Sequence, residues 1–266
     1  MNGRVDNMPF LEYCAVPAVS FTRGLKPLGK SVAHYLAPYD DGDTPARRMG
    51  RAVHCRILEP TRFNELYQCV DCEDRRTKLW KDAEAVWAKE GKELLKRSEA
   101  DICYACYEST ANHPRISQLF EEGDAEVSLF WTDVVTGLAC KCRIDWLRPD
   151  GIIIDLKTAA TAEPSEFARY AARFEYWIQA AWYRDGAIAC GIPVEHCLML
   201  PLELEPPYAV SWARWDDAAL LAGRQEYTRR LASLAAYYAL PEAERWAGYP
   251  TEVQTLSLPT WITKED

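Results

Sequence analysis

The chain has 266 residues, of which 48% are hydrophobic and 27% are charged, a composition that is ordinary for a soluble globular protein. This length is enough for one large domain or two small ones, each with a sizeable core. The formal net charge of −9 argues against a small basic module that binds nucleic acid by bulk charge. A nucleic-acid enzyme with a local basic groove or bound cations is still compatible with it. No secretory leader precedes the ten cysteines, and no apolar run reaches the length of a membrane span, so we expect a cytoplasmic protein with reduced thiols and no membrane partner.

The N-terminal part of the chain is predicted to be mainly helical. Residues 1–45 are rich in Pro and Gly, with a short amphipathic stretch at 24–36. Thr44 and Pro45 predict a helix start, with Thr as N-cap and Pro at the first helical position, and Pro60 ends this helix. Residues 71–101 alternate charges of both signs around a few apolar positions at helical spacing, which predicts an exposed helix or helix pair.

Strand signals begin in the middle of the chain. Residues 126–131 and 138–147 alternate in polarity around a short polar loop, which predicts a hairpin. A second turn at 148–151 precedes a β-branched strand at 152–156. The remaining signals are a helical region at 164–189, strands at 196–202 and 208–212, and a helix at 216–238.

These elements predict an α/β (α+β) fold, with a central mixed β-sheet flanked by helices. We treat residues 1–266 as a single domain. Its mainly helical part covers 1–120, and the sheet core with flanking helices covers 121–266.

The second hairpin places charged residues together. Pro149-Asp150-Gly151 fits a three-residue hairpin loop, and in that register Asp145 lies directly opposite Asp155. Lys157 is on the same face as Asp155, two residues further on. The alternation predicts Lys141, Arg143 and Asp145 on one face of the preceding strand, and on the other face Leu138, Cys140, Cys142, Ile144 and Trp146.

Two like charges that face each other across a sheet are destabilising unless something compensates them. A divalent cation is one compensation, and oxygen ligands favour Mg²⁺ or Mn²⁺. The simpler alternative is a surface carboxylate pair that is neutralised by Lys157 and Arg143. The β-branched run 152–154 before Asp155 favours the cation, because it places the acid poorly for free solvation.

The spacing Asp145…Asp155-Leu156-Lys157 resembles the D…(D/E)xK core of the PD-(D/E)XK nuclease superfamily, whose core is restriction-endonuclease-like. Three further segments resemble its RecB-like branch, and in particular the RecE-like (exonuclease VIII-type) exonucleases of phages and prophages. They are Gly50-Arg-Ala-Val-His54 followed by Leu58-Glu59-Pro60, Gln179-Ala-Ala-Trp-Tyr183, and Thr255-Leu-Ser-Leu-Pro259-Thr-Trp261. The lead-in Ser20…Leu25…Lys30-Ser31…His34-Tyr35 also fits that family.

The resemblance implies metal ligands. These are Asp145, Asp155, His54 and the backbone carbonyl of Leu156, which would hold Mg²⁺, with Mn²⁺ as a substitute and two ions per site. For His54, the simpler reading is a core histidine that is bonded to a carbonyl. Glu126 is a possible further acid, for which exposure at the surface is the simpler explanation.

The resemblance also implies catalytic roles outside the metal ligands. Lys157 would position the attacking water or stabilise the charge that develops on the phosphate. Its simpler role is an ion pair with Asp155. Gln179 and Tyr183 lie one helical turn apart, so they share a face that would turn toward the site; the alternative is ordinary core packing.

The implied activity is 5′-to-3′ exonuclease digestion of linear double-stranded DNA, which leaves 3′ single-stranded overhangs for phage-type recombination. The implied partners are DNA, copies of the chain in a ring-shaped trimer or tetramer, and a single-strand annealing protein. The resemblance also implies that the gene belongs to a phage or prophage and that the protein acts in the bacterial cytoplasm. The alternatives are a structure-specific endonuclease or single-strand exonuclease on the same core, and a catalytically silent DNA-binding scaffold.

A basic segment offers candidate DNA contacts. Residues 21–62 carry a net charge of +4, in contrast to the chain as a whole. Within it we select Arg48 and Arg51 as candidate DNA-binding residues, and beside the acid pair we select Lys141 and Arg143.

Two CxxC pairs, Cys69/Cys72 and Cys103/Cys106, superficially resemble a zinc or iron–sulfur site. Iron–sulfur nucleases of the RecB-like branch place one cysteine before the core and three after it, whereas both pairs here precede it. The second pair also lies in a predicted helix, where such thiols commonly serve packing. We therefore expect packing residues.

Overall fold

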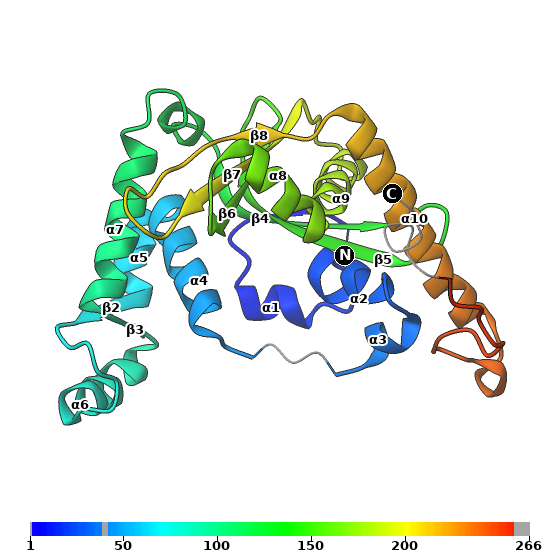
Figure 1. Cartoon of the computed structure of the whole chain (residues 1–266), viewed down its shortest axis with the longest axis horizontal. Helices are drawn as coiled ribbons and strands as arrows, with labels where there is room; N and C mark the ends of the chain where they lie inside the picture. The colour runs from blue at the N-terminus through cyan, green and yellow to red at the C-terminus, as the bar shows by residue number, and fades with distance from the viewer. Residues whose placement is uncertain (1, 39–41, 258–266) are drawn as a thin grey trace, which may run out of the picture.

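A six-stranded mixed β-sheet forms the centre of the computed structural model, which describes residues 2–38 and 42–257 (Figure 1). Its strand order is β1-β4-β5-β6-β7-β8, in which β6 and β7 are parallel and the other neighbours are antiparallel. The strands are β1 (Gly3–Val5), β4 (Asp124–Thr132), β5 (Ala139–Leu147), β6 (Ile152–Ala159), β7 (His196–Glu203) and β8 (Ala213–Arg214). A separate parallel pair consists of β2 (Tyr67–Val70) and β3 (Glu93–Lys96).

Helices cover both faces of the sheet. In Figure 1, α1 and α4 lie below the sheet, α10 runs along the right-hand side, and the β2–β3 pair with α6 projects at the lower left. The α-helices are α1 (Phe10–Ala15), α2 (Lys26–Leu28), α3 (Val32–Leu36), α4 (Pro45–Leu58), α5 (Pro60–Leu66), α6 (Lys78–Trp87), α7 (Arg97–Ala111), α8 (Pro164–Arg173), α9 (Tyr176–Ala189) and α10 (Asp217–Ala239). Short π- or 3₁₀-helices are η1 (Phe21–Leu25), η2 (Ala88–Glu90), η3 (Ser117–Phe120) and η4 (Glu242–Glu244).

The predicted fold class is confirmed, as are the hairpin of β4 and β5 and the start of α4. Thr44 caps α4 by accepting a hydrogen bond from the Arg47 backbone N–H, and Pro45 occupies the first helical position. No helix in the described part of the chain is long and apolar enough to cross a membrane.

Three predicted elements differ from the structure. The helical region 164–189 is two helices, because Glu175 adopts a left-handed conformation (φ 61°) between α8 and α9. The strand predicted at 208–212 is wrong: the edge strand β8 begins at Ala213, and only Val210 forms an isolated bridge. The charged region 71–101 contains α6, as predicted, but it also contains the strand β3. The four residues of β3 are too few for the spacing of apolar residues to distinguish a strand from a helix.

The two faces of the sheet bury separate clusters. Ile144 packs in the cluster that includes α9 and α10, whereas Trp146 packs in the cluster that includes α4 and α7. The predicted placement of these two residues on one face is therefore wrong. The reversal occurs at Glu126, which lies opposite Asp145 between two paired positions and has a left-handed backbone (φ 55°). A backbone outside the strand region changes which way the following side chains point.

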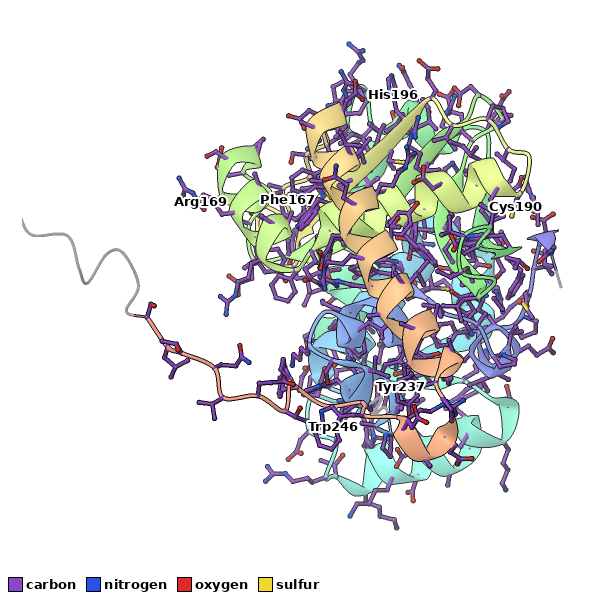
Figure 2. The ribbon with its side chains drawn as sticks, turned by 90° about the vertical axis from the view of Figure 1, so that its right-hand side faces the viewer. Phe167, Arg169, Cys190, His196, Tyr237 and Trp246 are labelled. Carbon is purple, nitrogen blue, oxygen red and sulfur yellow. The ribbon has the colours of Figure 1, made fainter. Side chains whose placement is uncertain are left out.

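The C-terminal segment leaves the body of the molecule. In Figure 2, it runs away from the end of α10 past Trp246, whose side chain is largely exposed. The same figure places His196 at the opposite end of the molecule, close to the N-terminal end of α10.

The turn before β6 generates a stability prediction. Gly151 has φ +82°, and a Cβ at this position would lie 2.6 Å from the Pro193 carbonyl oxygen. Gly137 also has a positive φ, +70°, but with open space around its Cα. We expect Gly137→Ala to lower the free energy of unfolding by about 1 kcal/mol, from backbone strain alone. Gly151→Ala should lower the free energy of unfolding by more, because the backbone near Pro193 must also shift. Urea titration measures the free energy of unfolding of both variants. Equal losses would contradict the inference that the lack of a side chain at Gly151 is required by packing.

Candidate active site

The site lies where two neighbouring strands separate. β5 and β6 pair only at Trp146–Ile154 and Leu147–Ile153, and the Arg148 N–H bonds to the Ile152 carbonyl at 3.0 Å. This is the predicted register, and it places Asp145 opposite Asp155 just beyond the last pair. From there β6 continues as the partner of β7, so the carboxylates stand at an open fork instead of in a closed ladder.

Neighbouring groups hold the two carboxylates in the fork. Asp145 Oδ2 accepts a hydrogen bond of 2.9 Å from the Leu156 backbone N–H, which bridges the strands where the ladder has ended. Asp155 is buried, and its Oδ2 lies 2.6 Å from Lys157 Nζ. Lys157 Nζ also lies over the Tyr176 ring, 4.6 Å from its centroid. The structure therefore brings together the predicted acid pair and the predicted lysine.

A third acid completes a group with His54. Single ligand atoms of His54, Glu126 and Asp145 all lie within 4.8 Å of one another, and His54 Nδ1 is 3.7 Å from Asp145 Oδ2. His54 comes from α4, which places it over the fork. Glu126 is a half-buried group that sequence reasoning placed at the surface, and its left-handed backbone is not visible in the sequence.

The pKa values of the site are shifted by burial and by the closeness of several carboxylates. Burial, and then the charge of Asp155, raises the pKa of Asp145 to about 7. Burial and the charge of Asp145 likewise raise the pKa of Glu126. Burial acts to lower the pKa of Lys157, but the charges of Asp155 and Asp145 raise it overall. The pKa of His54 is lowered, chiefly by burial, so the ring is neutral at physiological pH.

Gln179 and Tyr183 flank the other side of Asp155. Gln179 Nε2 donates to the Tyr183 hydroxyl at 2.9 Å, as expected for residues one turn apart on α9. Together with Asp155 they line a cavity of about 10 Å³, which is close to the space for one water molecule. Within the described residues, the buried Gln179 Oε1 has no hydrogen-bond partner, so it is free to accept a hydrogen bond from such a water.

This donor set suits a hard divalent cation. Of the three ligand atoms within 4.8 Å of one another, the two carboxylate oxygens are typical ligands for Mg²⁺ or Mn²⁺, and the neutral imidazole adds a nitrogen that suits a transition metal better than Mg²⁺. Without a cation the two acids repel each other. Among the described residues, the predicted ligand Asp155 lies outside this group, although the next residue along β6, Leu156, donates its backbone N–H to Asp145. A backbone hydrogen bond with Leu156 acts to raise the pKa of His54, which places that carbonyl beside the imidazole.

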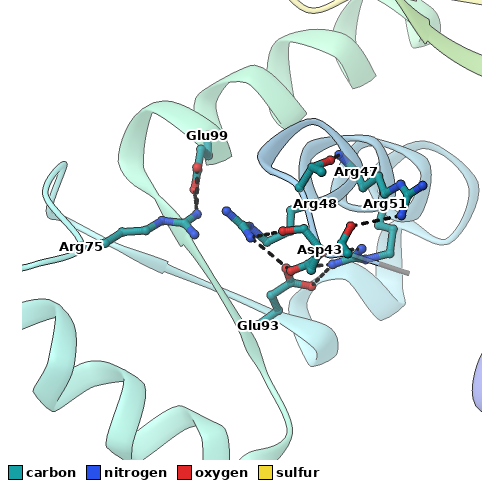
Figure 3. Close-up of polar contacts among 9 residues, drawn as sticks. Asp43, Arg47, Arg48, Arg51, Arg75, Glu93 and Glu99 are labelled. Atoms are coloured by element: carbon teal, nitrogen blue, oxygen red, sulfur yellow. Dashed lines mark hydrogen bonds and ion pairs between the residues drawn. The ribbon is translucent and has the colours of Figure 1, made fainter. Parts of the chain in front are cut away.

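The predicted DNA-binding residues make internal contacts. Lys141 is buried, and its ammonium donates to backbone carbonyls of the N-terminal segment, while Arg143 contacts Glu126 and the Met8 carbonyl. Arg48 and Arg51 both bond the Asp43 carboxylate, and Arg51 also bonds Glu93 (Figure 3). Lys141 therefore does not face solvent, and Arg48 and Arg51 have their charges partly neutralised within the chain.

Within residues 2–38 and 42–257, the cysteines are not part of a group of three or more neighbouring ligand atoms. All ten thiols are free, and the metal-ligating group found there contains none of them. Cys103 and Cys106 are buried in the cluster beneath α4 and α7, and burial raises the pKa of each to about 12. Both thiols pack in this core cluster.

The raised pKa of Asp145 predicts a pH-dependent stability. The folded protein holds this proton up to about pH 7, whereas the unfolded chain loses it near pH ~4, so ionisation of Asp145 costs stability progressively across that window. We expect Asp145→Asn, which keeps an oxygen for the Leu156 N–H, to raise the free energy of unfolding in EDTA at pH 8 by at least about 1 kcal/mol. The gain should vanish near pH 4, and Mg²⁺ should stabilise only the parent protein.

Asp150→Asn is the control for this prediction, because Arg148 lowers the pKa of Asp150, so that this carboxylate stabilises the fold at neutral pH. Its removal should cost stability at pH 8 instead of adding to it. A loss of stability at pH 8 in Asp145→Asn would contradict the inference that the ionised Asp145 carboxylate destabilises the folded protein.

Comparison with known proteins agrees with this architecture. A crystal structure from Eubacterium rectale, described as that of a "putative exonuclease", superposes with a TM-score of 0.62 at 12% identity, and the match covers 97% of this chain and 98% of that one. At this identity the likeness is one of fold. No relative was found among curated proteins. The family model described as "PDDEXK-like domain of unknown function (DUF3799)" matches residues 21–237, and the chain therefore belongs to this family of PDDEXK-like domains.

Proposed function

We propose that the protein is a divalent-metal-dependent exonuclease that digests linear double-stranded DNA in the 5′-to-3′ direction and leaves 3′ single-stranded overhangs. The observation that carries the proposal is the fork of β5 and β6. There Asp145, Asp155 and Lys157 meet under His54, with the ion-pair and hydrogen-bond distances given above. Strand polarity and the recombination role are supported by the resemblance of the sequence motifs to RecE-like exonucleases.

In this proposal, His54, Glu126, Asp145, Asp155 and the Leu156 carbonyl would hold Mg²⁺, with Mn²⁺ as a substitute and two ions per site. A metal held by these residues would supply a water of lowered pKa and positive charge opposite the phosphate.

The residues around the metal ligands have their own tasks. Lys157 stays protonated because of the raised pKa, so its ammonium donates hydrogen bonds to the attacking water or to a phosphate oxygen. Gln179 and Tyr183 orient a water beside Asp155 through the unpaired Gln179 Oε1. The water oxygen forms the new bond to phosphorus, the bond from phosphorus to the 3′ oxygen breaks, and that oxygen leaves with a proton.

Digestion of end-labelled DNA tests the activity. We expect the protein with Mg²⁺ to consume linear duplex and to spare closed circular duplex, with loss of a 5′ label before a 3′ label and no digestion in EDTA. Cleavage of the circle would favour the endonuclease, and consumption of single strands alone would favour the single-strand exonuclease. Absence of any cleavage in Mg²⁺ or Mn²⁺, with DNA still bound, would favour the silent scaffold.

Variants locate the activity in the fork. Asp155→Ala, Lys157→Ala and His54→Ala should each lower the rate by at least about 10²-fold while the fold persists. His196→Ala is the matched control, because this half-exposed histidine lies at the start of β7, at the far end of β6 from Lys157, and should leave the rate unchanged. Undiminished digestion by Lys157→Ala would contradict the proposed site.

We further propose that copies of the chain form a ring-shaped trimer or tetramer, and that a single-strand annealing protein takes up the 3′ strand. Encirclement would retain DNA on a chain whose net charge is −9. The expected result by light scattering on the full chain is a mass of three or four times 30.3 kDa. A monomeric mass over the whole concentration range used for digestion would contradict the ring.

A further inference from the structure

Two cations of β5 hold the N-terminal segment, defined here as residues 8–16. Lys141 Nζ donates to the carbonyl oxygens of Tyr13 at 2.7 Å, Cys14 at 3.3 Å and Val16 at 2.6 Å. Arg143 Nη1 donates to the Met8 carbonyl oxygen at 2.7 Å. Because β5 side chains alternate between the faces of the sheet, both cations reach the segment from the same face.

Arg143 makes a further contact that connects this segment to the candidate metal site. Its Nε donates to Glu126 Oε2, and its Nη1 also lies 3.4 Å from the Ser128 hydroxyl. Only 10% of the Arg143 side chain is exposed. The rings of Phe10 and Tyr13 cover the guanidinium at 5.9 and 5.8 Å. The Glu126–Arg143 pair is thus screened from solvent on the side of α1.

Glu126 needs such a partner if it is to serve the site. Its carboxylate belongs to the group with His54 and Asp145, where the two acids repel each other. A glutamate has three side-chain torsions, so without a fixed partner it would rotate away from a second carboxylate. The guanidinium is planar with donors in fixed directions, and it can bond Glu126, Ser128 and the Met8 carbonyl at once, which a lysine ammonium on a flexible stem does less precisely.

We propose that Arg143 is a positioning residue that holds the Glu126 carboxylate toward His54 and Asp145, with its own guanidinium fixed by the docked N-terminal segment. The inference rests on the proposed metal-dependent function, because it concerns a ligand of that site. Partners that orient metal ligands typically contribute 10–100-fold to metal affinity. The N-terminal segment thereby becomes part of the support of the site, although none of its side chains belongs to the ligand group.

Mn²⁺ binding to the full chain, measured by calorimetry at pH 8, tests the proposal without recourse to activity. We expect Arg143→Gln to weaken Mn²⁺ affinity by about 10-fold or more, and Arg143→Lys to lie between it and the parent protein. Glu126→Gln should weaken it by at least as much. The double variant Arg143→Gln/Glu126→Gln should bind like Glu126→Gln alone, because Arg143 acts through that carboxylate.

Lys141→Gln is the matched control, because Lys141 holds the same segment without a contact to Glu126 among the described residues. It should lower the melting temperature and, because the segment acts on the site only through Arg143, weaken Mn²⁺ affinity by a smaller factor than Arg143→Gln does. Circular dichroism verifies the folding of every variant. Parent-like Mn²⁺ affinity in Arg143→Gln, or an equal loss in Lys141→Gln, would overturn the positioning role and leave the proposed nuclease intact. Failure of the parent chain to bind Mn²⁺ would overturn both.

Discussion

The repulsion between Asp145 and Asp155 is the constraint on which the rest of the site depends. A pair of acids at the end of a two-stranded ladder would normally turn into solvent, yet here both are largely buried. The chain holds them with directional contacts: the Leu156 N–H bonds Asp145, and the Lys157 ammonium pairs with Asp155. Both contacts use the Oδ2 atom of the carboxylate, and a cation beside the pair would remove the repulsion that burial strengthens.

The geometry of the sheet makes this arrangement possible. β6 pairs with β5 for two residues, and then continues along β7 in the parallel direction. Beyond Trp146–Ile154, β5 no longer pairs with β6, and the opening between these two strands is where side chains find room. At the same level, the left-handed Glu126 reverses the faces of β4 and β5. This irregular residue adds a third acid to the fork.

The sequence predicted correctly those parts of the structure that depend on contacts between residues close together in the chain. The Pro149-Asp150-Gly151 loop fixes the register of the hairpin, and the register alone places Asp145 opposite Asp155. The capped start of α4 is equally local. The role of Glu126 was not predictable in this way, because the burial of a residue depends on α4 and on Arg143, which the fold brings from elsewhere. The break at Glu175 was hidden for the same reason: its carboxylate pairs with the buried Arg230 of α10.

The distribution of basic residues shows why the net charge of a sequence segment does not predict whether that segment forms a positively charged surface. The segment 21–62 is basic in sequence, but Arg48 and Arg51 are turned onto Asp43 and Glu93 (Figure 3). Arg56 lies among the rings of Phe63, Tyr104 and Tyr107. Cations that are paired or covered in this way contribute little to the long-range field that attracts a polyanion. The ion pairs and ring contacts of these arginines offset the free-energy cost of removing them from water. The same contacts orient helix α4, which carries His54. Part of the positive charge of segment 21–62 therefore supports helix α4, and under the proposed function the attraction for phosphate would come mainly from Lys157 and from a cation held in the fork.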